Sequence, residues 1–221
     1  MKLKCAVQSV VKNGAQLLAV LFVALVSNSA RSSEELLNQF FADAGTLSAV
    51  FTQRIVDDSG MTLDAAGGRV YLSRPGKFRW DYFSPGRVDV LEQQIIADGN
   101  AIFVYDLDLE QVTKRSLDNA LSQIPSLSLV ESKATVDEHF EVFDVGVTDG
   151  VSWVALKPKD LDAGFNQIMV GFENSVISAI TMLDVLGNET RLDLRGVEIN
   201  PQLEADVFEF TVPAGVDLLE Q

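Results

Sequence analysis

The chain has 221 residues and a formal charge of −15, because 32 Asp and Glu outnumber 17 Lys and Arg. This length suits one domain or two small ones and is enough for a hydrophobic core. So negative a charge argues against a nucleic-acid ligand, since affinity for nucleic acid comes largely from Lys and Arg that neutralise phosphates. Hydrophobic residues make up 47% of the chain, which is too many for an acidic disordered protein.

The N-terminal residues 1–30 have the pattern of a secretory signal peptide. Three lysines precede an uninterrupted apolar run at residues 17–26, and small side chains follow it up to Ala30. The run has ten residues, too few to cross about 30 Å of hydrocarbon as a stable helix. We therefore expect export of the protein and cleavage near Ala30. The single cysteine, Cys5, precedes the run, so we expect no lipid anchor.

Cleavage would change the chemistry available to the chain. Residues 1–30 contain three lysines, no acidic residue and the only cysteine. The mature chain would carry 14 basic and 32 acidic residues, a net charge of −18, and no thiol. A cysteine nucleophile, a disulfide and a thiolate metal site are therefore excluded for the mature protein.

The first predicted element of the mature chain is an amphipathic helix at residues 33–43. Ser32 and Ser33 precede two glutamates, a pattern that is common at the start of a helix. Apolar side chains then gather on one helical face, at Leu36, Leu37, Phe40 and Phe41.

From Thr46 onward the hydrophobic period shortens towards two residues, and turn signals recur at regular intervals. This pattern predicts an antiparallel sheet of about eleven short strands. The predicted strands are residues 46–57, 64–73, 77–83, 88–97, 101–106, 110–116, 137–147, 151–158, 165–173, 176–185 and 189–197.

One stretch, residues 117–132, interrupts the strand pattern. Its apolar residues have helical or broken-helical spacing around Pro125, which predicts two short helices. A long antiparallel meander with helices at these two places packs well as an open, incomplete β-barrel, with the helices over its mouth or concave face. We therefore expect residues 31–221 to form a single, mainly β domain of the α+β class.

Aromatic residues gather on one face of a predicted strand. Strict alternation places Phe78, Trp80 and Tyr82 together on that face. Phe51, from the first strand, and Phe103, from a later one, can line the same side. Such a face occurs both in an ordinary core and in the wall of an apolar ligand cavity, and composition leaves both interpretations open.

The sequence offers few groups for catalysis. His139 is the only histidine, and the chain has no nucleophile elbow, phosphate-binding glycine loop or metalloprotease motif. We interpret His139 as a surface residue at the start of a strand. Residues 106–110 resemble a calcium loop only superficially, because Gln111 stands where such a loop needs glycine. We expect no enzyme activity, no cofactor and no metal site.

Arg74 ends one predicted strand immediately before a Pro-Gly turn. Its guanidinium has five donors and no acceptor, so beside an apolar cavity it needs carbonyl or carboxylate partners. Backbone carbonyls at the ends of the predicted helices would serve. The residues alone leave this inward arrangement and a surface arginine that caps a hairpin equally open.

Several short motifs, taken in order, resemble the LolA family of periplasmic carriers of outer-membrane lipoproteins. The most specific is Arg-Pro-Gly-Lys-Phe-Arg-Trp at residues 74–80. The resemblance covers essentially the whole mature chain. The other matching motifs are residues 51–53, 58–60, 68, 98–99, 105–106, 110–113, 208–210 and 213–216.

The resemblance implies an open β-barrel with an apolar concave face, covered by a lid made of the helices near 33–43 and 117–132. It implies acylated lipoproteins as cargo. An inner-membrane ABC transporter would supply the cargo, and an outer-membrane lipoprotein receptor would take it. We expect the carrier to be a monomer in the periplasm, with no nucleic acid among its partners.

The resemblance also assigns roles to single residues. Arg74 matches the family's latch arginine, which binds lid backbone groups in the empty form and lets go when lipid enters. Phe78 and Trp80 match cavity positions, and Phe41 matches an apolar lid position. The full expected cavity set is Phe41, Phe51, Phe78, Trp80, Tyr82, Phe103, Ile124 and Leu127.

Two other functions remain open. The first is a periplasmic lipid-binding or lipoprotein-sensing protein of the same fold with different cargo. The second and weaker one is a hydrolase that uses His139 or a pair of acids. The sequence also departs from the family pattern, since Lys77 and Arg79 make the motif more basic than expected and the chain is short after Val216.

Overall fold

The computed structural model describes residues 32–87, 90–117, 120 and 130–220. These residues belong to one unit of the chain. The predicted signal peptide, most of the predicted helical stretch 117–132, and the expected cavity residues Ile124 and Leu127 lie outside the described residues.

The elements bounded within the described residues follow one another in a strand-rich order. They are α1 (Ser33–Asp43), β1 (Thr46–Val56), β2 (Thr62–Ser73), β3 (Lys77–Phe83), β4 (Leu91–Asp98), β5 (Ala101–Asp106), β6 (Gln111–Ser116), α3 (Lys133–His139), β7 (Phe140–Thr148), β8 (Val151–Pro158), β9 (Phe165–Glu173), β10 (Val176–Asp184), β11 (Glu189–Ile199), the 3-10 helix η2 (Ala205–Phe208) and β12 (Asp217–Glu220).

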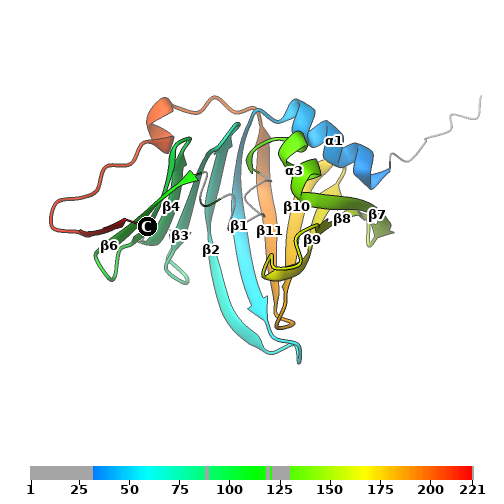
Figure 1. The fold of residues 1–221 in the computed structure, drawn as a ribbon, viewed down its shortest axis with the longest axis horizontal. Helices are drawn as coiled ribbons and strands as arrows, with labels where there is room; N and C mark the ends of the chain where they lie inside the picture. Colours follow the sequence, from blue (N-terminus) through cyan, green and yellow to red (C-terminus); the bar gives the residue numbers. More distant parts are fainter. Residues whose placement is uncertain (1–31, 88–89, 118–119, 121–129, 221) are drawn as a thin grey trace, which may run out of the picture. The chain divides into compact units, whose positions relative to one another are not determined.

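The strands form one twelve-stranded sheet in the order β12-β6-β5-β4-β3-β2-β1-β11-β10-β9-β8-β7. Neighbours run antiparallel except β12, which pairs in parallel with β6. The strand order has two ends, β12 and β7, so the curved sheet does not close (Figure 1). The predicted open, mainly β barrel with a helical lid is confirmed.

Strand bounds follow the predicted alternation closely. β3, β5, β8 and β9 coincide with the predicted ranges, and most other strands differ by a few residues at their ends. β12 was not predicted, because its four residues are all exposed and carry no alternating pattern of burial.

The prediction was wrong at the start of β7, where α3 occupies residues that we expected in a strand. The Ser132 side chain accepts a hydrogen bond from the Thr135 backbone N–H at 3.1 Å and so caps the helix. Val136 is buried beneath the first turn. Capping and burial together override the strand preference of these β-branched residues, and His139 is the half-buried last residue of α3, not the first of a strand.

α1 forms at the predicted residues. The Ser32 side chain accepts a hydrogen bond from the Glu35 backbone N–H at 3.1 Å, which is the expected N-cap. Leu36 and Leu37 are buried, and the helix packs against β7, β8 and β9 across one end of the sheet (Figure 1). Within the described part of the chain, no helix is long and apolar enough to cross a membrane.

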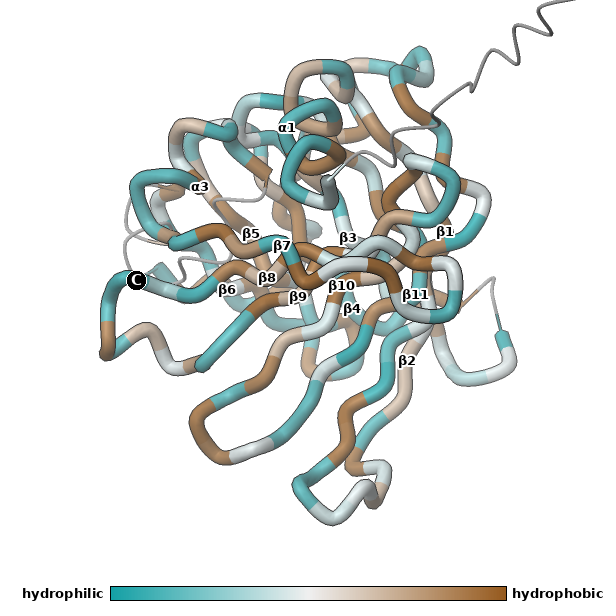
Figure 2. The backbone as a smooth tube through the Cα atoms, turned by 90° about the vertical axis from the view of Figure 1, so that its right-hand side faces the viewer, coloured by the Kyte–Doolittle hydropathy of each residue, from teal (hydrophilic) through white to brown (hydrophobic). Residues whose placement is uncertain are grey.

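The two faces of the sheet differ in what covers them. We call the face that carries Phe78 and Trp80 the inner face, and the face that carries Arg79 and Asp81 the outer face. Side chains alternate between the two faces along each strand, and Figure 2 shows apolar and polar stretches alternating along the backbone. Leu37 from α1 packs with inner-face residues in the main core.

The C-terminal segment, residues 200–216, covers the outer face of the sheet. Phe210 packs against Phe103 and Tyr105, with ring centroids 5.2 and 5.9 Å apart. Val212 and Val216 extend this second, smaller core over Phe103 and its neighbours. The C-terminal segment therefore packs on the outer face of β5 and β6 and leaves the inner face free.

Arg79 links this segment to the sheet. Its Nε donates to the Asp81 carboxylate at 2.9 Å, and its Nη1 donates to the Val207 carbonyl at 3.4 Å. Asp81 is buried and also accepts from Gln94 Nε2 at 2.7 Å. The basic residue that departs from the family pattern therefore pairs with a buried carboxylate, which needs such a partner to remain charged.

At Gly68 the backbones of β2 and β3 leave no room for a side chain. A Cβ atom at Gly68 would lie 1.8 Å from the Asp81 carbonyl oxygen, whereas one at Gly67 would lie 3.4 Å from its nearest neighbour, the Phe51 carbonyl oxygen. We expect Gly68→Ala to lower the free energy of unfolding by about 3 kcal/mol, because the backbone must shift to admit the methyl group. Gly67→Ala should change it by less than about 1 kcal/mol. Urea unfolding of both variants checks this, and equal midpoints would contradict it.

Candidate functional site

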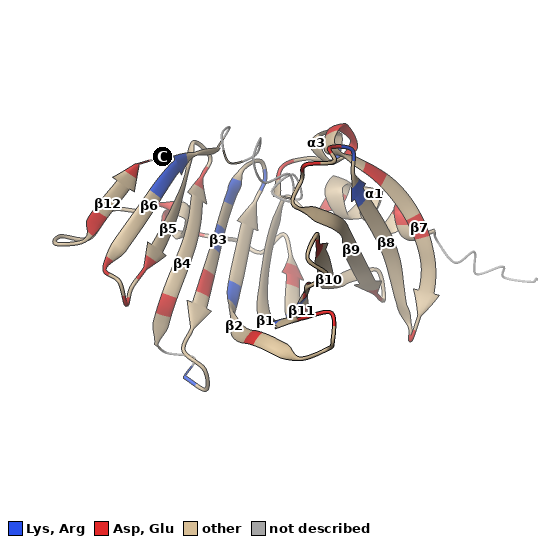
Figure 3. Ribbon diagram, turned by 60° about the horizontal axis from the view of Figure 1, so that its bottom comes forward, with Lys and Arg blue, Asp and Glu red and all other residues tan. Residues whose placement is uncertain are grey.

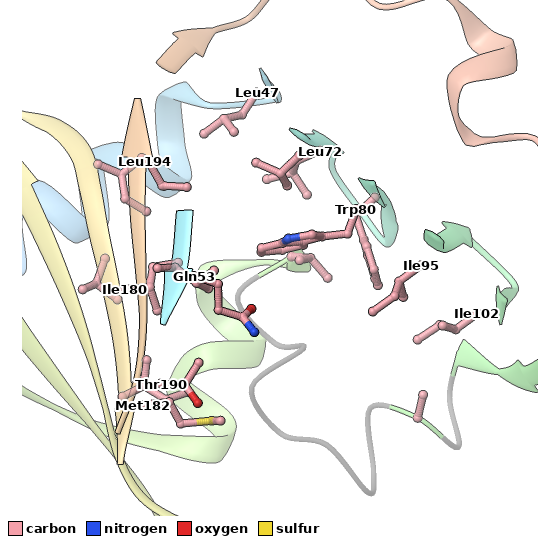
Figure 4. A pocket seen from close by; sticks show the side chains of 18 of the residues that line it. Leu47, Gln53, Leu72, Trp80, Ile95, Ile102, Ile180, Met182, Thr190 and Leu194 are labelled. Carbon is pink, nitrogen blue, oxygen red and sulfur yellow. The ribbon is translucent and has the colours of Figure 1, made fainter. Parts of the chain in front are cut away.

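A cavity of about 610 Å³ opens on the inner face of the sheet. This volume is in the usual range for a small-molecule site, about 300–1,000 Å³. Figure 4 shows side chains from opposite parts of the curved sheet pointing towards one another across it, with Ile180 and Met182 on one side and Ile95 on the other. The lining is almost entirely apolar, so the cavity favours a hydrocarbon over a polar ligand.

The inner face of β3 to β6 becomes more polar with distance from α1. Strand register places inner-face side chains in rows, since residues directly opposite on neighbouring strands share a face. The row nearest α1 is Leu47, Leu72, Phe78, Ala97 and Ile102, ending in Arg115 on β6, and the next is Ala49, Val70, Trp80, Ile95 and Val104, ending in Thr113. The third row contains Tyr82, Gln93, Asp106 and Gln111. The inner face is therefore amphipathic along the strands.

Arg74 connects the sheet to α1 at the apolar end. Its Nη1 donates to the Ala44 carbonyl at 2.5 Å, and its guanidinium carbon lies 4.7 Å from the Phe40 ring centroid and 4.6 Å from that of Phe41. Ala44 is the C-cap of α1, where unsatisfied carbonyls attract a cation. Burial lowers the pKa of Arg74 to about 10, so the side chain remains protonated at neutral pH.

The carbonyl that Arg74 binds is held in place from the opposite side. Asn200, directly after β11, accepts hydrogen bonds from the Gly45 and Thr46 backbone N–H groups at 2.9 and 3.2 Å. Its Nδ2 donates to the Asp43 carbonyl at 2.7 Å. The end of α1 is thus fixed by backbone contacts to both Asn200 and Arg74, and its apolar residues reach the cavity from there.

The structure places several of the expected residues at the cavity. Phe78, Trp80 and Tyr82 line it, as does Arg74. Phe51 is buried behind this wall and makes edge contacts with the Trp80 and Tyr82 rings, with centroids 5.4 and 5.2 Å apart. It supports the wall more than it faces the cavity.

Two expectations need correction. Phe103 does not line the cavity but packs on the outer face against Phe210. The register pairs Val104 with Ile95, so Val104 and not Phe103 shares the inner face with that residue. On α1, Phe40 lines the cavity, whereas Phe41 contacts Phe40 and the Arg74 guanidinium.

Sequence reasoning missed the half of the wall that comes from β9, β10 and β11. Alternating apolar residues on each of these strands carried the signal, but they contain no aromatic cluster to mark them. The lining residues from these strands are Ile168, Val170, Ile177, Ile180, Met182, Leu192 and Leu194, with Thr190 as the polar member.

Catalytic or metal chemistry finds no support at this site. His139 lies at the end of α3 and is not among the residues that line the cavity. Across the residues that the structure describes, His, Cys, Asp and Glu side chains form no group of three that could hold a metal ion.

Comparisons with known proteins agree with this geometry. The family model described as outer membrane lipoprotein carrier protein LolA matches residues 42–211. An outer-membrane lipoprotein carrier protein of Methylococcus capsulatus is 36% identical over 194 residues, which span 88% of this chain and 90% of the relative. One of Cupriavidus pinatubonensis is 37% identical over 203 residues, or 90% and 93% of the two chains.

A solved structure supports the fold independently. The crystal structure of an uncharacterized conserved protein from Thermus thermophilus aligns with a TM-score of 0.52 at 14% identity, covering 86% of this chain and 100% of that one. At this identity the likeness concerns the fold alone. The family match and the relatives decide the assignment: the chain belongs to the LolA family of outer membrane lipoprotein carrier proteins.

Proposed function

We propose that this protein shields the acyl chains of lipoproteins in the inner-face cavity and carries them through the periplasm between the inner and outer membranes. The observation that carries the proposal is an apolar cavity of about 610 Å³ in a member of a lipoprotein carrier family. Moving one CH₂ group out of water is worth about 0.8 kcal/mol, so a cavity that takes even one acyl chain can compete with a membrane for it.

The distribution of charge supports carriage between membranes. Acidic residues lie on α1 and α3, on several strands and in turns between them (Figure 3), and over the whole sequence 32 acidic residues outnumber 17 basic ones. A negatively charged exterior is repelled by anionic lipid surfaces. We therefore expect the acidic exterior to disfavour contact between the carrier and an anionic bilayer.

We assign Arg74 the role of a latch between the lid and the sheet. Its hydrogen bond to the Ala44 carbonyl holds the end of α1 beside the cavity, and Phe40 from the same helix lines that cavity. Cargo that fills the space must displace α1, which breaks the bond. The closed arrangement then favours release, because the hydrogen bond reforms when the cargo leaves.

This arrangement accounts for transfer without a nucleotide on the carrier. In the proposed sequence, an inner-membrane ABC transporter loads the cargo and an outer-membrane lipoprotein receptor removes it. The energy that opens the latch is supplied at loading and is returned at unloading, so the reformed hydrogen bond and the receptor's affinity for lipid together drive the second step.

The cavity proposal is tested by binding of a purified acylated lipoprotein to the mature protein. We expect binding to depend on the acyl chains, so the same lipoprotein without them should not bind. Met182→Gln places an amide in the apolar wall and should weaken binding about tenfold. Thr181→Gln, the neighbouring position on the other face of β10, is the matched control. Equal binding of both lipoprotein forms would contradict the proposal.

The latch proposal is tested with Arg74→Leu. We expect this variant to bind acylated lipoprotein at least as tightly as the wild type, because loading no longer breaks a hydrogen bond, and to release it to receptor-bearing outer-membrane vesicles about tenfold more slowly. Arg69→Leu removes an exposed arginine from β2, the strand that precedes Arg74, and should release at the wild-type rate. Discharge of Arg74→Leu at the wild-type rate would refute the latch.

A further inference from the structure

The Trp80 indole holds a hydrogen-bond donor in the wall of the cavity. Its ring extends from β3 into the cavity (Figure 4) and packs edge-on against Phe51, at 5.4 Å between centroids. Among the residues that the structure describes, its Nε1 atom is buried in the cavity wall and has no hydrogen-bond partner, so a ligand reaches it only when neighbouring side chains move aside. Most buried polar groups in proteins are paired, because an unpaired donor loses the hydrogen bond it made to water.

Gln53 supplies a second polar group at the same cavity. Its side chain extends from β1 into the space between the two walls (Figure 4). The Tyr82 hydroxyl donates to Gln53 Oε1 at 3.3 Å. Burial, with a contribution from the charge of Asp64, raises the pKa of Tyr82 to about 12, so this phenol remains a donor at neutral pH. With Oε1 engaged by Tyr82, Nε2 is the donor group that this amide has left for a ligand.

An acyl chain by itself cannot satisfy these donors, since a hydrocarbon has no acceptor. The carbonyl oxygen that links an acyl chain to its head group has two lone pairs and is the natural partner. The position of the donors also fits. Trp80 lies in the row between the mainly apolar row nearest α1, whose polar member on β6 is Arg115, and the polar row of Tyr82 and Gln93.

We propose that Trp80 and Gln53 form a carbonyl-binding subsite, which selects ester- or amide-linked acyl groups over alkyl chains that lack a carbonyl. This inference rests on the proposed lipid carriage and names the part of the cargo that the cavity recognises. The aliphatic wall supplies the affinity for hydrocarbon, and the two donors supply the chemical selectivity.

The test compares two synthetic lipopeptides that differ only in the linkage of their chains. One carries two palmitoyl esters on a glyceryl group, and the other carries two hexadecyl ethers. We expect the wild-type protein to bind the ester about fivefold more tightly, as one or two neutral hydrogen bonds imply. Trp80→Phe should bind both lipopeptides with nearly equal affinity, because it keeps an aromatic ring and removes the donor.

Two further variants distinguish selectivity from general damage to the cavity. Gln53→Met should also reduce the ester preference, whereas Phe78→Leu should weaken both ligands and keep the ratio. If Trp80→Phe does not fold, the wild-type ratio and Gln53→Met decide the question. Equal affinity of the wild type for ester and ether would overturn the subsite and leave lipid carriage standing. Failure to bind either lipopeptide would overturn both.

Discussion

The central constraint on this structure is the apolar inner face of the sheet, which is left partly uncovered because the sheet does not close on itself. A closed barrel or a sandwich buries such a face completely, but here the strand order ends at β7 and β12 without closing. α1 reaches over part of the face, with Leu37 and Phe40 at the cavity, and a volume of about 610 Å³ is left among the side chains. The same apolar surface is thus available either to the lid or to a ligand.

Several stabilising contacts lie on the outer face of the sheet, away from the cavity. The C-terminal segment packs on the outer face through Phe208 and Phe210, and the Arg79–Asp81 pair holds it to β3 and β4. On the inner face, α1 is held by Leu36 and Leu37 in the main core, and its end is held by hydrogen bonds from Arg74 and Asn200. The hydrogen bonds at the helix end are the contacts that a ligand can exchange most easily.

Periodicity predicted the strands well because a half-buried sheet imposes a local pattern that the sequence must carry. It predicted α1 for the same reason, through Ser32 and the apolar stripe of the helix. It misplaced Phe103, since the phase of β5 relative to β4 is set by pairing across strands and not by either strand alone. Arg74 could be proposed as a latch only through family resemblance, because its partner, the Ala44 carbonyl, is a backbone atom that any sequence has.

The cavity could not be predicted from the pattern of any single strand. Alternation shows which side chains face inward, but a void depends on how side chains from β1–β6 and β9–β11 meet across the curved sheet. The aromatic residues that alternate along β3 indicated one wall of the cavity. The aliphatic residues on the opposite side form a wall only through the curvature of the sheet (Figure 4). The buried indole donor of Trp80 is likewise a property of its surroundings, not of its position in the strand.

Competition between α1 and cargo for the inner face is tested most directly by the distance between the lid and the sheet. Spin labels at Asn38→Cys on α1 and Lys77→Cys on β3, both exposed, report this distance. A second pair, at Lys77→Cys and Lys157→Cys on β8, reports on the sheet alone. We predict that a bound diacyl lipopeptide lengthens the first distance and leaves the second almost unchanged. An unchanged first distance in the loaded protein would contradict a lid that gives way to lipid.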